Sequence, residues 1–290
     1  MKLGAIFPQL DIGADRGAVR EYGLAVDEMG FDNISAFDHV VGADRAVHVG
    51  WAGPYDAEST FHEPLVLFGY LAALCPSLGF ATGIVILPQR QTVLVAKQSA
   101  EVDILSGGRF RLGVGIGWNA VEYEALGERF NNRGRRIEEQ IELLRRLWTE
   151  PSVTFDGKYH RVTGASIAPL PLQRPIPLWM GGGAGPALAR VGRLADGWFS
   201  NAKPGPHLDE ALATIRSAAQ AANRDPSEVG VEGRILVGDG DLERIVGEFA
   251  EWRKVGASHV SFNTMGAGLE NVEAHLVALR AAITSVRNTI

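Results

Sequence analysis

The feature that most constrains the fold is a regular alternation of short β-rich runs and longer helical patterns along the 290 residues. The helical patterns place apolar residues three and four apart, and the short runs are rich in β-branched and aromatic residues. Strands that alternate with helices form a parallel sheet. The expected strands are residues 2–9, 33–39, 78–86, 109–117, 177–180, 197–201, 229–237 and 259–265. The expected helices are residues 16–29, 63–75, 92–105, 121–148 with a break near Asn131-Asn132, 186–194, 208–222, 242–255 and 272–286.

Eight strand–helix units fit a closed (β/α)8 TIM barrel, an α/β fold in which helices surround parallel strands. The alternative is a doubly wound sheet with a second domain, but no linker-like change of composition divides the chain. We therefore predict a single barrel domain over residues 1–290. An insertion after the fourth strand, at about residues 151–175, interrupts the alternation. It contains a predicted β-hairpin at 153–162, turning at Asp156-Gly157, and a proline-rich extended stretch.

Composition argues against several classes of function. The formal charge of −6 argues against general nucleic-acid binding, which needs a basic face. The single cysteine, Cys75, excludes an intrachain disulfide and indicates a reducing compartment, so a cytoplasmic protein is expected. No apolar run is long enough to cross a membrane, and no secretory segment is expected. Because the seven histidines lack metal-ligand spacing, no metal site is expected either.

The end of the second expected strand carries the first candidate catalytic residues. Active sites of such barrels lie at the C-terminal ends of the strands, and Asp38-His39 stands at one of them. An imidazole there can donate to a developing anion or move a proton near neutral pH. The alternative is a hydrogen-bonded structural histidine. The position at a strand end favours a functional His39, with Asp38 lining the same mouth.

Two glycine-rich stretches follow other strand ends. Gly181, Gly182 and Gly183 lie between a strand and a helix, where unobstructed backbone N–H groups can bind phosphate; a plain turn is the alternative. The second stretch, 109–119, reads RFRLGVGIGWN. Its GxGxG spacing is not the GxGxxG of a dinucleotide fingerprint, and its glycines share one face of a strand. We interpret them as clearance for a flat ring, with tight packing inside the barrel as the alternative.

At these residues the chain resembles the bacterial luciferase-like flavin monooxygenase superfamily, and within it the branch that uses the deazaflavin coenzyme F420. The resemblance covers essentially the whole chain. It is carried by FDHV at 37–40, ATGIVILPQR at 81–90, KQSAEVDILSGGRFRLGVGIGWNAVEYEALG at 97–127, RGRRIEEQIELLRRLW at 133–148, FDGKYH at 155–160 and PIPLWMGGGAGPALARVGRLADGWF at 175–199.

The resemblance implies a barrel with an insertion and a set of site residues. Asp38 and His39 would face the coenzyme ring as catalytic candidates. A non-prolyl cis peptide at Gly83-Ile84 would form a bulge behind the ring. The implied contacts of the ring and ribityl chain are Thr82, Gly83, Ile84, Gly115, Gly117, Trp118, Asn119 and Tyr123. The implied phosphate contacts are Gly181, Gly182 and Gly183. The resemblance also implies a homodimer.

One departure from the branch concerns Trp118. Sugar-phosphate dehydrogenases of this type carry a glutamate immediately after the last glycine of GxGxG, where this chain has tryptophan. The departure argues against sugar-phosphate oxidation and leaves His39 as the assigned proton donor. Glu122, one helical turn later, is a substitute candidate.

These observations support three hypotheses about function. The first is an F420-dependent oxidoreductase that transfers hydride to or from a small organic substrate. The second is an FMN-dependent monooxygenase of the same superfamily. The third is a non-catalytic relative that only binds a flavin. Substrate contacts are expected from the loops at 40–60, 151–175 and 200–207. Packing within the protein is the alternative role for their aromatic residues, Trp51, Tyr55, Phe155 and Tyr159.

Overall fold

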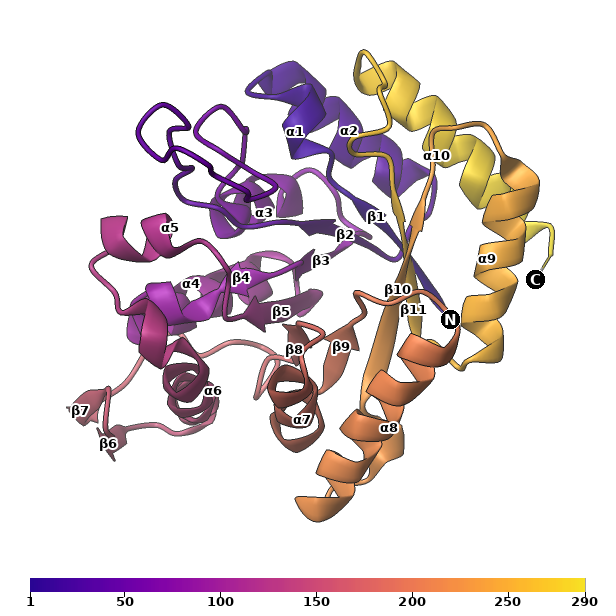
Figure 1. The fold of residues 1–290 in the computed structure, drawn as a ribbon. Helices are drawn as coiled ribbons and strands as arrows, with labels where there is room; N and C mark the ends of the chain where they lie inside the picture. Colours follow the sequence, from indigo (N-terminus) through magenta and orange to yellow (C-terminus); the bar gives the residue numbers. More distant parts are fainter. Residues whose placement is uncertain (290) are drawn as a thin grey trace.

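The computed structural model describes residues 1–289, and its centre is a closed ring of parallel strands surrounded by helices (Figure 1). The ring order is β3-β2-β1-β11-β10-β9-β8-β5-β4, and a further β3–β5 pairing closes it. Since β3 and β4 are two parts of one interrupted strand, the ring has eight strands, and the predicted (β/α)8 barrel is confirmed. Its strands are β1 Lys2–Ile6, β2 Asn33–Ala36, β3 Gly79–Thr82, β4 Val85–Ile86, β5 Phe110–Gly115, β8 Leu178–Gly181, β9 Gly197–Phe199, β10 Gly230–Leu236 and β11 His259–Asn263.

The helices pack their apolar faces against the outside of this ring. Several begin at a side chain that accepts a backbone N–H of the first turn, as Asp15, Glu63 and Asn271 do. The α-helices are α1 Gln9–Ile12, α2 Arg16–Glu28, α3 Pro64–Ala72, α4 Thr92–Leu105, α5 Ala120–Ala125, α6 Arg133–Thr149, α7 Gly185–Leu194, α8 Pro206–Ala221, α9 Leu242–Lys254 and α10 Val272–Arg287. The break expected near Asn131-Asn132 is present, since α5 ends at Ala125 and α6 begins at Arg133; Gly127, at φ +73°, lies between them. No helix within residues 1–289 is both long and apolar enough to span a membrane.

Charged and polar side chains lie in the interior of the ring. Arg111 on β5 forms an ion pair with Glu232 on β10 at 2.9 Å, and its guanidinium lies 4.4 Å above the Trp179 ring. Ser261 on β11 donates to the second oxygen of Glu232 at 2.6 Å. A small apolar cluster of Ala81, Trp179 and Phe199 completes this layer. Charged and polar groups from β5, β10 and β11 are therefore bound to one another inside the barrel.

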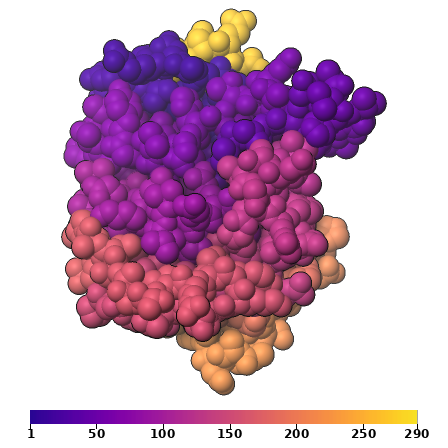
Figure 2. Space-filling view, turned by 90° about the vertical axis from the view of Figure 1, so that its left-hand side faces the viewer, coloured from indigo at the N-terminus to yellow at the C-terminus, as the bar shows by residue number. Residues whose placement is uncertain are grey.

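Two segments project from the regular barrel. The loop between β2 and α3, residues 37–63, stands out beyond the ring of helices in both views (Figures 1 and 2). The insertion after α6 forms the expected antiparallel hairpin, β6 Val153–Asp156 and β7 Arg161–Ala165. The hairpin turn is held against α6 by Glu139, which accepts from Lys158 N, Tyr159 N and the His160 ring, all at 2.8 Å.

Candidate functional site at the barrel mouth

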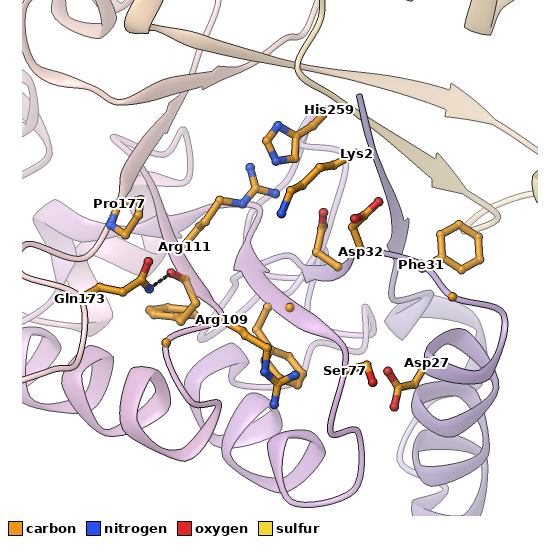
Figure 3. Close-up of a pocket in the computed structure, with 16 residues that line it drawn as sticks. Lys2, Asp27, Phe31, Asp32, Ser77, Arg109, Arg111, Gln173, Pro177 and His259 are labelled. Carbon is orange, nitrogen blue, oxygen red and sulfur yellow. Dashed lines mark hydrogen bonds between the residues drawn. The ribbon is translucent and has the colours of Figure 1, made fainter. Parts of the chain in front are cut away.

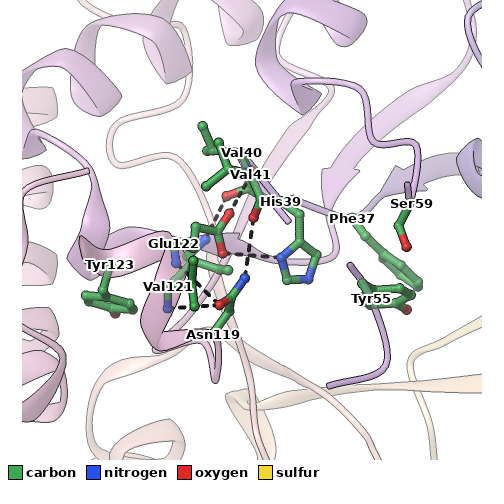
Figure 4. A network of polar contacts seen from close by, with 12 residues as sticks. Phe37, His39, Val40, Val41, Tyr55, Ser59, Asn119, Val121, Glu122 and Tyr123 are labelled. Atoms are coloured by element: carbon green, nitrogen blue, oxygen red, sulfur yellow. Dashed lines mark hydrogen bonds and ion pairs between the residues drawn. The ribbon is translucent and has the colours of Figure 1, made fainter. Parts of the chain in front are cut away.

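A histidine–glutamate pair occupies the C-terminal mouth of the barrel (Figure 4). His39 follows β2, and its Nδ1 lies 3.2 Å from Glu122 Oε2. The other oxygen of Glu122 accepts the backbone N–H of Val40. The Glu122 side chain is fully buried, whereas that of His39 is 10% exposed. Sequence analysis named Glu122 only as a substitute for a missing glutamate; its partner lies 83 positions earlier in the chain.

The helix α5 positions Glu122. Asn119 caps this helix, and its side-chain oxygen accepts from Val121 N at 3.1 Å and Glu122 N at 3.3 Å. Its amide also reaches the carbonyl of Val41 at 3.4 Å. Asn119, which the resemblance placed at the coenzyme, thus holds the start of α5 against the loop that carries His39.

The pair fixes what His39 can do chemically. Because the Glu122 carboxylate only accepts hydrogen bonds, Nδ1 carries a proton and Nε2 is the second, variable position. Among residues 1–289, no side chain or backbone group hydrogen-bonds to Nε2. A buried carboxylate also stabilises the imidazolium that forms when Nε2 takes up a proton. The arrangement suits general acid–base catalysis through Nε2.

Aromatic rings surround the imidazole. The centroid of Phe61 lies 4.8 Å from that of His39, that of Tyr55 lies 5.1 Å away and that of Trp118 lies 5.4 Å away. A cavity of about 360 Å³ opens beside these residues. Trp118 is 38% exposed and lies 5.7 Å from Trp51. The imidazole therefore lies among aromatic rings, and the cavity beside it also has polar lining residues, Asp56, Ser59 and Asn119, as a site for a small organic molecule would have.

Asp38 is placed differently from its neighbour. Arg90 donates to Oδ1 at 2.7 Å and to Oδ2 at 3.3 Å, and Ile86 N donates to Oδ2 at 2.9 Å. Burial raises the pKa of the Asp38 carboxyl, and the charge of Arg90 opposes that rise. The remaining guanidinium nitrogen of Arg90 binds Glu63 at 2.9 Å. Since both oxygens are engaged, the geometry gives Asp38 a positioning role beside His39.

The implied cis peptide at Gly83-Ile84 is present, and it lies between β3 and β4. Ala81 pairs with Arg111 and Val85 with Val114. Between these pairs, residues 82–84 of this strand lie opposite residues 112–113 of β5. Thr82 bridges the irregularity. Its hydroxyl donates to the carbonyl of Gly113 at 2.7 Å and accepts that residue's N–H at 2.8 Å. Thr82 is fully buried, and its two hydroxyl hydrogen bonds take the place of backbone hydrogen bonds between this strand and β5.

The alternating glycines of β5 accommodate this bulge. A Cβ at Gly113 would lie 1.9 Å from the Thr82 carbonyl oxygen, and one at Gly115 would lie 2.6 Å from Ile84 Cδ1. A Cβ at Gly117, whose φ is +64°, would lie 2.6 Å from the Ile86 side chain. The atoms that need this clearance belong to the protein. The tight-packing alternative therefore describes these glycines better than direct clearance for a ring.

The second glycine stretch lies where β8 leads into α7. The side chain of Ile84 reaches Gly181, where a Cβ would lie 3.3 Å from it. Gly182 is in a positive-φ conformation, φ +122°, and its carbonyl accepts from Trp198 Nε1 at 2.8 Å. A Cβ on Gly183 would meet nothing within 4 Å. No side chain caps the start of α7. An open backbone at a helix start fits the phosphate of a coenzyme.

Tyr123, the remaining residue implied at the coenzyme, lies below the surface of the mouth. Its ring is buried with its edge against Phe130, and its hydroxyl donates to the carbonyl of Ile116 at 2.8 Å. Burial raises the pKa of this phenol. In this structure Tyr123 ties α5 to the end of β5.

A larger cavity, about 520 Å³, lies at the opposite end of the barrel (Figure 3). Lys2, Arg109, Arg111 and His259 are among its lining residues. Burial lowers the pKa of His259 to about 3, and the charges of Arg111 and Lys2 add to that effect. Arg109 donates to the Cys75 carbonyl at 3.2 Å. This histidine is kept neutral near cations, so the cavity is a poorer candidate for proton transfer than the mouth.

Comparisons with known proteins agree with this geometry. The sequence profile of the luciferase-like monooxygenase family matches residues 4–275. An uncharacterised protein of Mycobacterium tuberculosis is 37% identical over 172 residues, which are 59% of each chain. The FMNH2-dependent dimethylsulfone monooxygenase of Pseudomonas putida is 32% identical over 186 residues, 63% of this chain and 51% of that protein. The matched regions thus span about half to three-fifths of these relatives.

Solved structures share the fold at low sequence identity. An F420-dependent secondary alcohol dehydrogenase in complex with an F420-acetone adduct superimposes with a TM-score of 0.78 at 17% identity, over 99% of both chains. A monooxygenase from Streptomyces bottropensis gives 0.72 at 21% identity, over 98% of this chain and 99% of that one. Because the family profile covers nearly the whole chain, this protein belongs to the luciferase-like monooxygenase family of oxidoreductases.

Proposed function

We propose that this chain is an F420-dependent oxidoreductase that transfers hydride between the deazaflavin and a small organic substrate. The observation that carries the proposal is the His39–Glu122 pair, because His39 lines a cavity at the barrel mouth and its Nε2 has no hydrogen-bond partner within residues 1–289. When bound, the coenzyme supplies the hydride donor or acceptor. The residues of the chain then have to bind the substrate, exclude water and move one proton.

His39 would move that proton. In the oxidising direction a substrate hydroxyl would give its proton to Nε2, and in the reducing direction Nε2–H would protonate the substrate oxygen. Glu122, at 3.2 Å from Nδ1, stabilises the charged ring in both directions. The rings of Tyr55, Phe61 and Trp118 limit the access of water to that nitrogen.

The coenzyme phosphate would lie against Gly183 and the start of α7. We expect Gly183→Asp to weaken coenzyme binding by at least tenfold, because a carboxylate would repel the phosphate. The unliganded fold has room for that side chain. The matched control is Gly247→Asp on α9, where a Cβ also meets nothing within 4 Å. Its coenzyme affinity should equal that of the wild type.

A titration of the purified protein with F420 and, separately, with FMN tests the choice of coenzyme. Quenching of tryptophan fluorescence should saturate with F420 at lower concentration than with FMN. Tight FMN binding without saturable F420 binding would overturn the deazaflavin assignment. The proposed site would still be supported if Gly183→Asp weakened FMN binding.

An FMN-dependent monooxygenase is the second candidate, and the Pseudomonas putida relative at 32% identity is the observation that favours it. The two candidates differ in their need for oxygen. Consumption of oxygen and reduced FMN that yields a hydroxylated or cleaved product would support the monooxygenase. Turnover that proceeds without oxygen would support the F420-dependent reaction.

A further inference from the structure

Arg234 on β10 is a charged residue that the site described above does not use. Inward and outward positions alternate along this strand. Glu232 faces the interior, where it meets Arg111, and a Cβ on Gly233 would meet the Trp252 ring of α9 on the outside. Arg234 therefore also points inward, one step nearer to the mouth than Glu232. Its strand register places it opposite Ser261 of β11.

The guanidinium of Arg234 lies 5.1 Å from the centre of the Phe37 ring. Within residues 1–289 it makes no hydrogen bond and no ion pair. Glu232, two residues earlier, could neutralise it, but its two oxygens are bound by Arg111 at 2.9 Å and Ser261 at 2.6 Å. This part of the interior thus holds two guanidinium groups and one carboxylate.

Arg234 is half-buried, so its guanidinium loses part of its hydration on folding without gaining an opposite charge. Removal from water disfavours a guanidinium unless hydrogen bonds and an opposite charge replace the lost hydration. Burial lowers the pKa of Arg234, although Glu232 opposes that shift. The cation–π contact with Phe37 supplies only part of what water would. A residue placed this way is better suited to binding an anion that arrives from outside.

The neighbours of Arg234 belong to the same mouth as His39. Phe37 is two residues before His39, and a Cβ on Gly83 would lie 3.5 Å from the Phe37 ring. Burial raises the pKa of Tyr55, and the charge of Arg234 opposes that rise, so the two groups interact. The Tyr55 ring lies 5.1 Å from His39 (Figure 4). One guanidinium, one phenol and one imidazole thus gather around this space.

We propose that Arg234 binds the carboxylate of a substrate whose reacting carbon faces His39. The planar fork of a guanidinium matches the two oxygens of a carboxylate, and Tyr55 can donate a further hydrogen bond. The apolar remainder of the substrate would lie along Phe61 and Trp118. This inference rests on the proposed function and narrows its substrate class to small organic acids that carry an oxidisable or reducible group.

Binding of benzoate to the coenzyme-free protein tests the inference without any need for turnover. Isothermal titration should show saturable benzoate binding and weaker or no binding of benzamide, which has the same ring without the charge. Arg234→Met should weaken benzoate binding at least tenfold, and Arg234→Lys should lie between the two proteins. Arg216→Met, which removes an exposed arginine of α8, is the matched control and should bind benzoate like the wild type.

The variants also show whether Arg234 affects folding and whether it binds the substrate or the coenzyme. Arg234→Met should keep or raise the thermal midpoint, since it removes an unpaired charge. If it fails to fold, Arg234→Lys and Arg234→Gln carry the same test.

Equal benzoate affinity in wild type and all these variants, or no saturable binding, would overturn the inference. Loss of F420 or FMN binding with unchanged benzoate binding would assign Arg234 to the coenzyme instead. Failure of both coenzymes to bind the wild type would refute the proposed function, whatever the benzoate result.

Discussion

Two histidine–glutamate pairs in this protein have the same composition and different surroundings. In both, a glutamate accepts a hydrogen bond from histidine Nδ1, at 3.2 Å for His39–Glu122 and 2.8 Å for His160–Glu139. Each glutamate also accepts backbone N–H groups of the segment that carries its histidine. The pairs differ at the second ring nitrogen. His160 Nε2 lies 2.9 Å from the Thr92 hydroxyl, whereas His39 lines the cavity of the mouth and its Nε2 has no hydrogen-bond partner within residues 1–289.

A hydrogen-bonded histidine–glutamate pair is therefore not by itself diagnostic of catalysis. A carboxylate that orients an imidazole fixes its tautomer in either case. At the hairpin, the second nitrogen closes a network between α4, α6 and the insertion, so the pair fastens one segment to another. At the mouth, the same arrangement leaves one nitrogen for a substrate. The following variants test this distinction.

The largest expected effect is the loss of turnover in His39→Gln. We expect the rate constant to fall by a factor of about 10² to 10⁴, because positioned acid–base groups typically contribute that much. His160→Gln is the matched variant and should retain turnover within about twofold. Coenzyme absorbance, followed across a panel of small hydroxy acids and alcohols, measures both. Unchanged turnover in His39→Gln would favour the view that the protein binds a flavin without catalysis.

The next effect in size concerns stability at the second pair. Glu139→Ala removes the acceptor of Lys158 N, Tyr159 N and the His160 ring. We expect the free energy of unfolding to fall by about 2 kcal/mol, because two half-buried donors and one exposed donor of a charge-assisted network lose their acceptor. Glu142→Ala removes an exposed glutamate of the same helix and should change it by less than about 0.5 kcal/mol. Chemical denaturation measures both, and equal values in the two variants would contradict the anchoring role.

A smaller effect is expected in the pH dependence of stability. Burial lowers the pKa of His160 from 6.5, and hydrogen bonds lower the pKa of Glu139 from 4.5 against the effect of burial. As the pH falls from about 6.5, the unfolded chain therefore protonates this histidine before the folded protein does, and stability decreases. Below about pH 4.5 the glutamate adds to the loss in the same direction.

The control for this pH effect is His160→Gln, which has no titrating ring at the hairpin. The difference in thermal midpoint between wild type and variant should shrink as the pH falls from 7 to 5. Because the ring is partly solvated, the effect should amount to less than about 1 kcal/mol. A difference that is constant over this range would show that the titration of His160 is not coupled to folding.

Much of this arrangement could be predicted from the sequence, because it follows from local patterns. The alternation of strands and helices determines the barrel, and the barrel determines that His39, at the end of a strand, lies at the mouth. The hairpin around Asp156-Gly157 was likewise predicted by its turn residues. These features need only neighbouring positions in the chain and the rule that barrel strands end on one face.

Other parts of the site depend on contacts between distant segments. Asp38 adjoins His39 in sequence, yet Arg90 binds both of its oxygens, and only the folded geometry shows this. The pairing of His39 with Glu122 joins two loops, and spacing along the chain does not reveal it. Arg234 lies within the expected strand 229–237 and not at its end, where barrel sites are sought, so the sequence analysis did not single it out. The glycines of β5 illustrate the same limit, since their crowded neighbours come from the bulge of another strand.

The smallest effect on turnover is expected in Thr92→Val, which tests whether the two pairs are independent. The change removes the partner of His160 Nε2 and one acceptor of Gln140, whose amide keeps the carbonyl of Leu87 at 3.1 Å and that of Arg90 at 3.3 Å. We expect a loss of about 1 kcal/mol in stability, the usual value of one hydrogen bond. The measurement is chemical denaturation together with the turnover assay.

Turnover is the decisive reading for Thr92→Val, because a physical connection to the mouth exists. Gln140 binds the backbone of Arg90, and the guanidinium of Arg90 holds Asp38 beside His39. If the backbone of Arg90 stays fixed by its remaining hydrogen bonds, turnover should not change, and the hairpin pair serves stability alone. A severalfold decrease in turnover at full folding would mean that the network around His160 helps to position His39. The two pairs would then be connected. Their second ring nitrogens would still distinguish which histidine can transfer a proton, but both pairs would help to position the residues of the mouth.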